Sequence, residues 1–122
     1  MSQIAPGWQV EIAEVAGWVV VKVANPQPEP LDAPPLAEQV RAALDARHNQ
    51  RLLLDLSEVP LLYSHLVGQL VLLQKRVTVL GGEMRVCGLS PGNRQVLHLC
   101  RLDERFPDYR TRDDALAARP QP

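Results

Sequence analysis

The sequence of 122 residues has few aromatic residues, few cysteines and no excess of charge of one sign. Only 4% of the residues are aromatic, so Leu, Val and Ala must fill most of any core. The formal net charge is −1, with acidic and basic residues interspersed along the chain. A nucleic-acid-binding domain usually presents a basic face, so we expect no binding of DNA or RNA.

Long apolar segments are also missing. No run approaches the roughly 20 apolar residues that cross a bilayer. The N-terminal residues lack the basic and then apolar segments of a secretory signal. We therefore expect a cytoplasmic protein without membrane insertion. Cys87 and Cys100 have no metal-ligand spacing, and a reducing cytosol disfavours a disulfide between them. We expect both to be small buried apolar residues, and we expect no metal site and no cofactor.

The composition that remains is typical of one globular domain, which we expect to span residues 1–122. Hydrophobic residues make up 46% of the chain and charged residues 22%, enough to build a core. Residues 8–15 alternate apolar and polar, and residues 18–23 are rich in β-branched side chains. With Ala16-Gly17 as a turn, the two segments predict an N-terminal hairpin of strands.

Helical and strand-like patterns alternate through the rest of the chain. In the helix that follows Ser64, one buried stripe is expected at Leu66, Leu70, Leu73, Val77 and Leu80. The opposite face is expected to carry His65, Gln69, Leu72, Arg76 and Val79. The alternation predicts an α/β fold with a mixed sheet, about four helices and right-handed crossovers. In order, we expect an extended proline-rich loop at 25–35, a helix at 34–48 stopped by Asn49, a strand at 51–56 and a loop at 57–63. A helix capped by Ser64 and ended by Gly81-Gly82 follows, and then a strand at 83–87. The last elements expected are a helix after Ser90-Pro91 with Val96, Leu97 and Cys100 on its apolar face, a short strand at 106–109, a helix capped by Thr111 and a frayed tail from 119.

Several short motifs occur in the order and spacing of one known family. The set comprises Leu31-Asp32-Ala33, Asp55-Leu56-Ser57 followed by Val59, Leu80-Gly81-Gly82, Leu89-Ser90-Pro91, Leu102-Asp103 with Phe106-Pro107, and Ala115-Leu116. With these motifs the chain resembles the STAS family of bacterial anti-sigma-factor antagonists. The resemblance implies the STAS fold and a regulatory role through binding of a protein partner.

The resemblance also points to a regulatory site. In that family an Asp-Ser-x-Gly motif enters the second main helix, and a partner kinase that is itself an anti-sigma factor phosphorylates a hydroxyl there. The corresponding residues here are Tyr63, Ser64, His65 and Leu66. Tyr63 replaces the Asp, His65 occupies the acceptor position and Leu66 replaces the Gly. No serine phosphoester can form at His65, so we expect a partner-binding loop without the usual phosphoswitch.

Ser64, His65 and Tyr63 each have more than one interpretation. Ser64 is either a displaced phosphoacceptor or the N-cap of the helix, and the cap is the simpler role. His65 is either a partner contact, a site of histidine phosphorylation or a solvent-facing residue of the first turn. Tyr63 either anchors a partner, as interface aromatics often do, or fills the space of the lost Asp.

A wider partner surface is expected at Asp55, Gln69, Leu72 and Arg76. Asp55 ends a central strand and has the alternative of hydrogen bonding to the loop that follows. No nucleophile–base pair, P-loop or dinucleotide motif occurs, so we expect no enzyme and no nucleotide site. The sequence therefore predicts a module that binds a kinase-type anti-sigma factor or a related signalling protein. The alternative is a STAS scaffold subunit of a larger signalling or lipid-transport assembly, with oligomers allowed.

Overall fold

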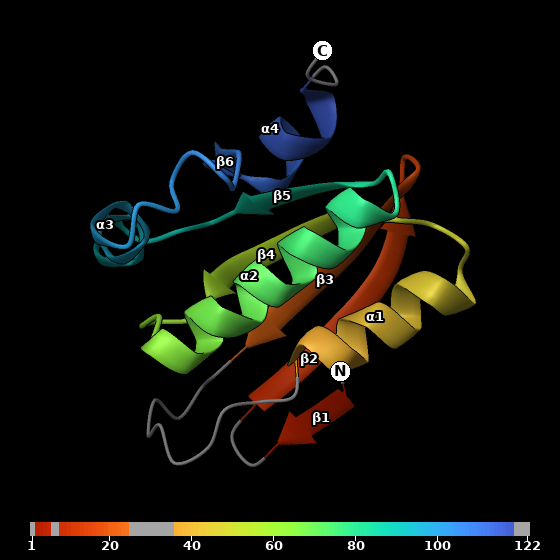
Figure 1. Cartoon of the computed structure of the whole chain (residues 1–122), viewed down its shortest axis with the longest axis horizontal. Coiled ribbons are helices and arrows are strands. Elements are labelled where there is room, and N and C mark those ends of the chain that lie inside the picture. The colour runs from red at the N-terminus through yellow and green to blue at the C-terminus, as the bar shows by residue number, and fades with distance from the viewer. Residues whose placement is uncertain (1, 6–7, 25–35, 119–122) are drawn as a thin grey trace.

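The computed structural model describes residues 2–5, 8–24 and 36–118, with the backbone alone at 2–5 and 64. Six strands form one sheet in the order β1-β2-β3-β4-β5-β6 (Figure 1). The three N-terminal strands are antiparallel neighbours, and β3 to β6 run parallel. The strands are β1 (Ser2–Ala5), β2 (Trp8–Val15), β3 (Trp18–Ala24), β4 (Arg51–Glu58), β5 (Glu83–Cys87) and β6 (Asp108–Tyr109).

Four helices flank this sheet: α1 (Leu36–Ala46), α2 (Ser64–Val79), α3 (Pro91–Leu99) and α4 (Arg112–Ala117). Figure 1 shows α1 and α2 crossing one face of the sheet, whereas α4 lies beside β5 and β6 on the other side. Each parallel crossover steps to the next strand in the same direction, so the strand order never reverses. The ligand crevice that α/β sheets form at such a reversal is therefore not built here.

The main core lies between the sheet and α1, α2 and α3. Alternate residues of each central strand point into it, because side chains of a strand alternate between its two faces. Within α2, the predicted stripe of Leu66, Leu70, Leu73 and Val77 is buried. The strand side chains of this core include Val19, Val21, Val23, Leu52, Leu54, Leu56, Met84 and Val86.

A smaller core lies on the opposite face, under α4. It contains Trp18, Val20, Leu53, Cys87 and Ala115. Arg85 is also buried there, although it is charged. Its guanidinium stacks 4.4 Å from the Trp18 ring, pairs with Glu83 at 3.1 Å, and donates to the carbonyl oxygens of Ala115 and Ala118. These bonds satisfy carbonyls at the end of α4 and thereby dock this short helix on the sheet.

The predicted hairpin, helices and parallel strands are all present, and several boundaries match. Ala16 and Gly17 both have positive φ, as a two-residue hairpin turn requires. Ser90 accepts a hydrogen bond from the amide of Asn93, and Thr111 accepts one from Asp114, so both predicted N-caps are confirmed. Gly81 ends α2 with φ 77°, as predicted.

Other boundaries were predicted wrongly. Helix α1 ends earlier, because His48 rather than Asn49 takes the left-handed conformation, and the amide of Asn49 bonds back to Leu44. Strand β4 continues to Glu58, and β1 was not predicted at all. Leu80 lies beyond the end of α2 and is 49% exposed instead of buried.

Two further predictions are each correct only in part. Cys87 is buried as expected, but Cys100 is exposed, because it lies at the C-terminal cap of α3 rather than on the apolar face of that helix. The predicted short strand at 106–109 is confined to its last two residues, and Phe106 is instead a core residue. The loop at 25–35, including Pro34 and Pro35, and the tail from 119 lie outside the described residues.

Candidate functional site at the start of α2

The loop before α2 is held in place by a buried amide. Asn93, in the first turn of α3, is fully buried. Its Oδ1 accepts from the amide of Leu62 at 2.8 Å, and its Nδ2 donates to the carbonyl of Val59 at 2.8 Å. Buried backbone groups are costly when unpaired, so both bonds fix the loop to α3. Asn93 was not predicted from the sequence. The signal was its position four residues before Leu97, which places a polar side chain on the apolar face of α3.

The first helical residue of α2 is Ser64, and the residue that caps the helix is Tyr63. Tyr63 has extended backbone angles (φ −83°, ψ 160°), and its carbonyl accepts from the amide of Val67 at 3.0 Å. The prediction of Ser64 as the N-cap is therefore wrong by one residue. The amide of the adjacent Leu62 donates to Asn93, which holds the loop directly before the extended Tyr63 and the start of the helix.

Two aromatic rings lie over the start of α2. The rings of Tyr63 and His65 are stacked, with centroids 6.1 Å apart and planes inclined by only 6°. Both residues are half-buried. Nε2 of His65 is buried and has no hydrogen-bond partner among the residues that the structure describes. A phosphoryl donor cannot reach a buried nitrogen unless the ring moves, so this geometry disfavours phosphorylation at Nε2.

The other residues expected in or near the loop divide between core and surface. Leu66 is fully buried beneath the loop, where it supports the first turn of α2 without being exposed itself. Leu61, which the sequence analysis did not single out, is 42% exposed just before the helix. The exposed part of this site is therefore formed by Leu61 together with the stacked Tyr63 and His65.

The face of α2 that was expected to be free is partly occupied by α1. Gln69 Oε1 accepts from the amide of Ala37 at 2.9 Å, and Arg76 pairs with Asp45 at 3.0 Å. Gln69 and Arg76 thus face α1, which corrects the expectation that they lie opposite the core. Leu72 and Val79 are exposed, by 56% and 83%, as predicted.

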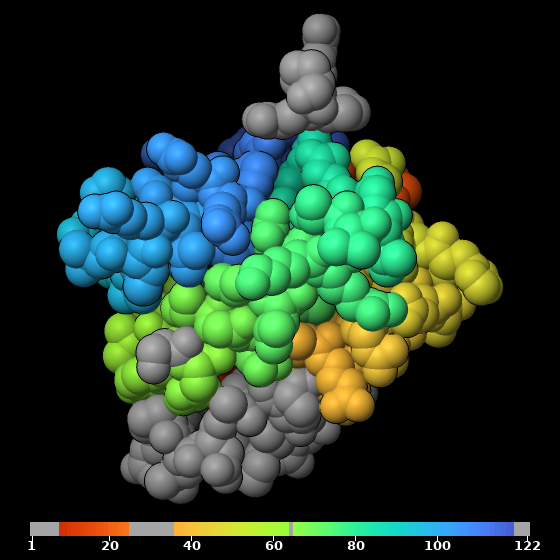
Figure 2. Space-filling view, in the orientation of Figure 1, coloured from red at the N-terminus to blue at the C-terminus, as the bar shows by residue number. Residues whose placement is uncertain are grey.

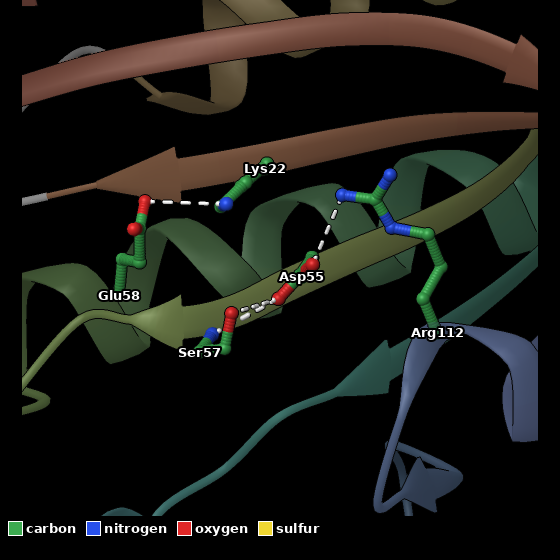
Figure 3. Close-up of polar contacts among 5 residues, drawn as sticks. All are labelled: Lys22, Asp55, Ser57, Glu58 and Arg112. Carbon is green, nitrogen blue, oxygen red and sulfur yellow. Dashed lines mark hydrogen bonds and ion pairs between the residues drawn. The ribbon is translucent and has the colours of Figure 1, made fainter.

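Asp55 lies on the opposite face of the sheet from α1 and α2, and its two carboxylate oxygens have different partners (Figure 3). One oxygen accepts from the amide of Ser57 at 3.0 Å and from its hydroxyl at 2.7 Å. The other pairs with Arg112 of α4 at 3.0 Å. The alternative expected for Asp55, a bond to the loop that follows, is therefore close to the structure, but Ser57 belongs to β4 rather than to the loop. Next to it, Lys22 pairs with Glu58 at 3.4 Å.

These partners change the acidity of Asp55. Burial alone raises the pKa of a carboxyl, because the charged form loses its hydration. Here the hydrogen bonds from Ser57 and the ion pair with Arg112 outweigh burial, so the pKa of Asp55 lies below its ordinary value. The ionised carboxylate is thus a structural link between β4 and α4.

The structure gives little support for metal or thiol chemistry. Among residues 8–24 and 36–118, no three His, Cys, Asp or Glu side chains cluster in a way that holds a metal ion. Burial, together with the nearby Asp55 charge, raises the pKa of Cys87 to about 12, so its thiol is not a nucleophile at neutral pH. None of the described helices combines the length and hydrophobicity needed to cross a membrane.

Solved structures match this chain along most of its length, whereas a comparison with curated protein sequences found no match. An anti-sigma factor antagonist from Mycobacterium paratuberculosis is 31% identical, with 92% of this chain and 94% of that one covered and a TM-score of 0.75. A STAS domain protein from Planctomyces limnophilus is 24% identical, with 88% and 94% covered and a TM-score of 0.76.

A third similar structure is a chain from the stressosome, described as a signal integration and transduction hub. It is 18% identical, with 87% of this chain and 92% of that chain covered and a TM-score of 0.66, a likeness of fold alone. The family model of the STAS domain matches residues 19–115. That range includes β3 to β6, the crossover helices and the start of α2. The chain therefore belongs to the STAS domain family and resembles its anti-sigma-factor antagonists.

Proposed function

We propose that this STAS domain is a regulatory binding module that docks on a signalling protein through the start of α2. The partner class is an anti-sigma factor of the kinase type, or a related regulator. Binding occurs without a serine phosphoswitch at the usual position. The observation that carries the proposal is His65, which occupies the acceptor position of the family motif in the first turn of α2.

The start of a helix such as α2 is a favourable place for a phosphate. The first amides of an α-helix have no carbonyl to bind within the helix, and the macrodipole is positive there, so an added phosphate would be stabilised. A phosphoserine at this point would also add about two negative charges and repel an acidic partner. The stacked rings of Tyr63 and His65 take the place of that switch with a fixed aromatic surface.

The loop before α2 and the start of this helix are held in one conformation. The loop at 59–63 is fixed by two buried hydrogen bonds from Asn93, and Leu66 anchors the helix start in the core. A surface held in one conformation loses little entropy when a partner binds. Tyr63 is of a residue type that is enriched among the strongest contributors to protein interfaces, and Leu61 and His65 add apolar and aromatic contact area beside it.

Affinity capture from the native organism tests this function. The wild-type chain, Leu61→Gln and His65→Ala are each used as bait, with Leu99→Gln as a matched control, because Leu99 is also exposed but lies at the far end of α3. We expect a signalling protein to be captured by the wild type and the control, and lost with both site variants. Capture that is equal for all four baits would overturn the proposed site.

The same experiment distinguishes the scaffold alternative. A chain of the stressosome, which is described as a signal integration and transduction hub, shares this fold. If the captured proteins are STAS domains or transporter subunits without a regulator of the kinase type, the scaffold function replaces our proposal.

A further inference from the structure

Gly68 lies in the second turn of α2, where neither its backbone nor its neighbours require a glycine. The residue is exposed, and its φ is not positive. A Cβ at this position would meet nothing within 4 Å. Inside a helix, glycine is less favourable than alanine because it loses more backbone entropy on folding. The packing of this chain therefore gives no reason for a glycine here.

The other glycines of the described chain have reasons within the fold. A left-handed φ, which a side chain disfavours, occurs at Gly17, Gly81 and Gly88. A Cβ at Gly82 would collide with the backbone of Gln50, and Gly92 lies in the first turn of α3 beside the hydroxyl of Ser90. Gly68 differs from all of these, so we looked for its role at the surface of the molecule.

The segment that presents Gly68 carries no formal charge. Residues 59–74 contain no Asp, Glu, Lys or Arg, although 22% of the chain is charged. His65, Gly68 and Leu72 recur at i, i+3 and i+7, so they lie along one side of α2. Figure 2 shows α2, in green, at the surface of the molecule beside α1, in yellow and orange. We call the surface formed by Leu61, Tyr63, His65, Gly68 and Leu72 the neutral stripe.

The neutral stripe meets charged side chains at its Leu72 end. Acidic and basic residues of both helices line a groove next to Leu72, between α1 and α2. Arg41 and Arg76 of this groove already pair with Asp45. A charged group of a partner would therefore gain little there. Selection of a partner depends instead on the uncharged part of the stripe, at residues 61–68.

We infer that an uncharged, apolar segment of the partner protein packs along the neutral stripe and makes its closest backbone contact with α2 at Gly68. The inference rests on the proposed function, since it extends the partner surface from the start of α2 along the helix. Without a Cβ at Gly68, the two backbones can approach closely and gain dispersion contacts. Burial of the apolar side chains then stabilises the complex without taking a charge out of water.

Selection of a phage-displayed library of randomised peptides on the full chain tests this inference. We expect the selected peptides to be rich in Leu, Ile, Met and small residues, with no excess of either charge. Their affinity is then measured by fluorescence anisotropy for the wild type, Gly68→Ala and Gly68→Leu. We expect Gly68→Leu to weaken binding by about tenfold or more and Gly68→Ala to weaken it less, because a side chain added to a packed contact forces it apart. Added salt should leave the affinity nearly unchanged.

Two controls separate a local contact from a general effect. Ala42→Leu adds the same side chain to an exposed position of α1, and we expect it to bind the peptides as the wild type does. The Tm of both Gly68 variants should be no lower than that of the wild type, because the space around Gly68 is open. A loss of binding then cannot be due to unfolding.

Several results would overturn the inference. These are an empty selection, binders that depend on charge or weaken steeply with salt, affinity unchanged in Gly68→Leu, or an equal loss in Ala42→Leu. A lower Tm in both Gly68 variants would show that Gly68 has a role within the fold instead. Self-association of the chain that Gly68→Leu abolishes would show that a second copy occupies the stripe, which also contradicts the inference.

The outcome is distinguishable from that of the proposed function. If the native partner is captured through Leu61 and His65 but is captured equally by Gly68→Leu, the inference fails and the proposed function stands. If apolar peptides bind in the expected way but no signalling protein is captured, the proposed function fails and the neutral stripe remains a binding surface.

Discussion

At the scale of single residues, the buried polar side chains decide how the site is held. Asn93, Arg85 and Asp55 are all buried, and each links two segments that are distant in the sequence. Asn93 joins α3 to the loop before α2, Arg85 joins β5 to the end of α4, and Asp55 joins β4 to the start of α4. Removing one partner of such a bond leaves the other buried and unpaired, which costs more than the bond itself contributes.

The amide of Asn93 is the first test at this scale. We expect Asn93→Ala to lower the free energy of unfolding by about 2–4 kcal/mol, because Leu62 N–H and the Val59 carbonyl both lose their partner. Partner affinity should fall as well, since the loop at 59–63 is no longer fixed. Urea denaturation measures the first effect, and Gln95→Ala, an exposed amide on the same helix, is the control. A change no larger than that of the control would contradict the assigned role.

Asp55 makes stability depend on pH in a defined direction. Its pKa is lower in the folded state than the ordinary value of about 4, so its contribution is complete above that value and is lost as the pH falls through the folded pKa. We expect Asp55→Asn to reduce stability by about 1–3 kcal/mol at pH 7. The difference from wild type should shrink below pH 4.

Urea unfolding at pH 7 and at pH 3 measures this dependence. Glu104→Gln serves as the control, because Glu104 is exposed in the loop after α3. If Asp55→Asn lowers the free energy of unfolding by the same amount at both pH values, the ion pair and the Ser57 bonds do not depend on the carboxylate charge.

At the scale of elements, two glycines differ in how tightly their surroundings are packed. Gly88 follows β5 with φ 76°, and a Cβ there would lie 2.9 Å from the amide nitrogen of Ser57. Gly68 lies in the middle of α2, where a Cβ would meet nothing within 4 Å. The same substitution therefore has opposite consequences at the two positions.

We expect Gly88→Ala to lower the free energy of unfolding by more than about 1 kcal/mol, because the left-handed backbone disfavours a Cβ and the end of β4 must move. Gly68→Ala should raise it by about 0.5–1 kcal/mol, because alanine loses less backbone entropy in a helix. Chemical denaturation of both variants checks the pair. Destabilisation by Gly68→Ala would mean that the exposed face of α2 is packed differently.

The C-terminal end of α4 is held by the charged side chain of Arg85. Replacing Arg85 by Met removes the donors to Ala115 and Ala118 while keeping much of the side-chain volume. We expect faster hydrogen exchange of the α4 amides with β3 and β4 still protected, and a lower Tm. Arg105→Met, an exposed arginine in the loop after α3, is the control. Unchanged exchange in α4 would show that Arg85 does not hold this helix.

The elements that the sequence predicted are those whose periodicity is strong. Buried strands such as β4, and α2 with its stripe from Leu66 to Val77, follow from apolar spacing alone. Helix ends that depend on tertiary contacts do not, and the N-cap was misplaced by one residue where the Leu62 amide donates to Asn93 and fixes the preceding loop. The pairing of Gln69 and Arg76 with α1 also requires the packing angle of two helices, which periodicity does not contain.

At the scale of the whole molecule, two surfaces lie on one side of the sheet. The stacked Tyr63 and His65 mark the start of α2, and further along this helix Leu72, Leu73 and Arg76 line a groove shared with α1. Helix α4 and the bonds of Asp55 lie on the opposite side, where they stabilise the fold. Our central proposal concerns the first of these surfaces: the start of α2 binds a protein partner, and His65 offers no hydroxyl for a serine phosphoswitch there.

The most direct measurement uses the captured partner, purified and mixed with the chain and Mg-ATP. Intact-protein mass spectrometry records phosphorylation, and calorimetry records the dissociation constant before and after the incubation, with Ser64→Ala as the comparison. We predict no added phosphate and the same dissociation constant for both chains at both times. ATP-dependent phosphorylation of Ser64 that releases the partner, and that is lost in Ser64→Ala, would contradict the account.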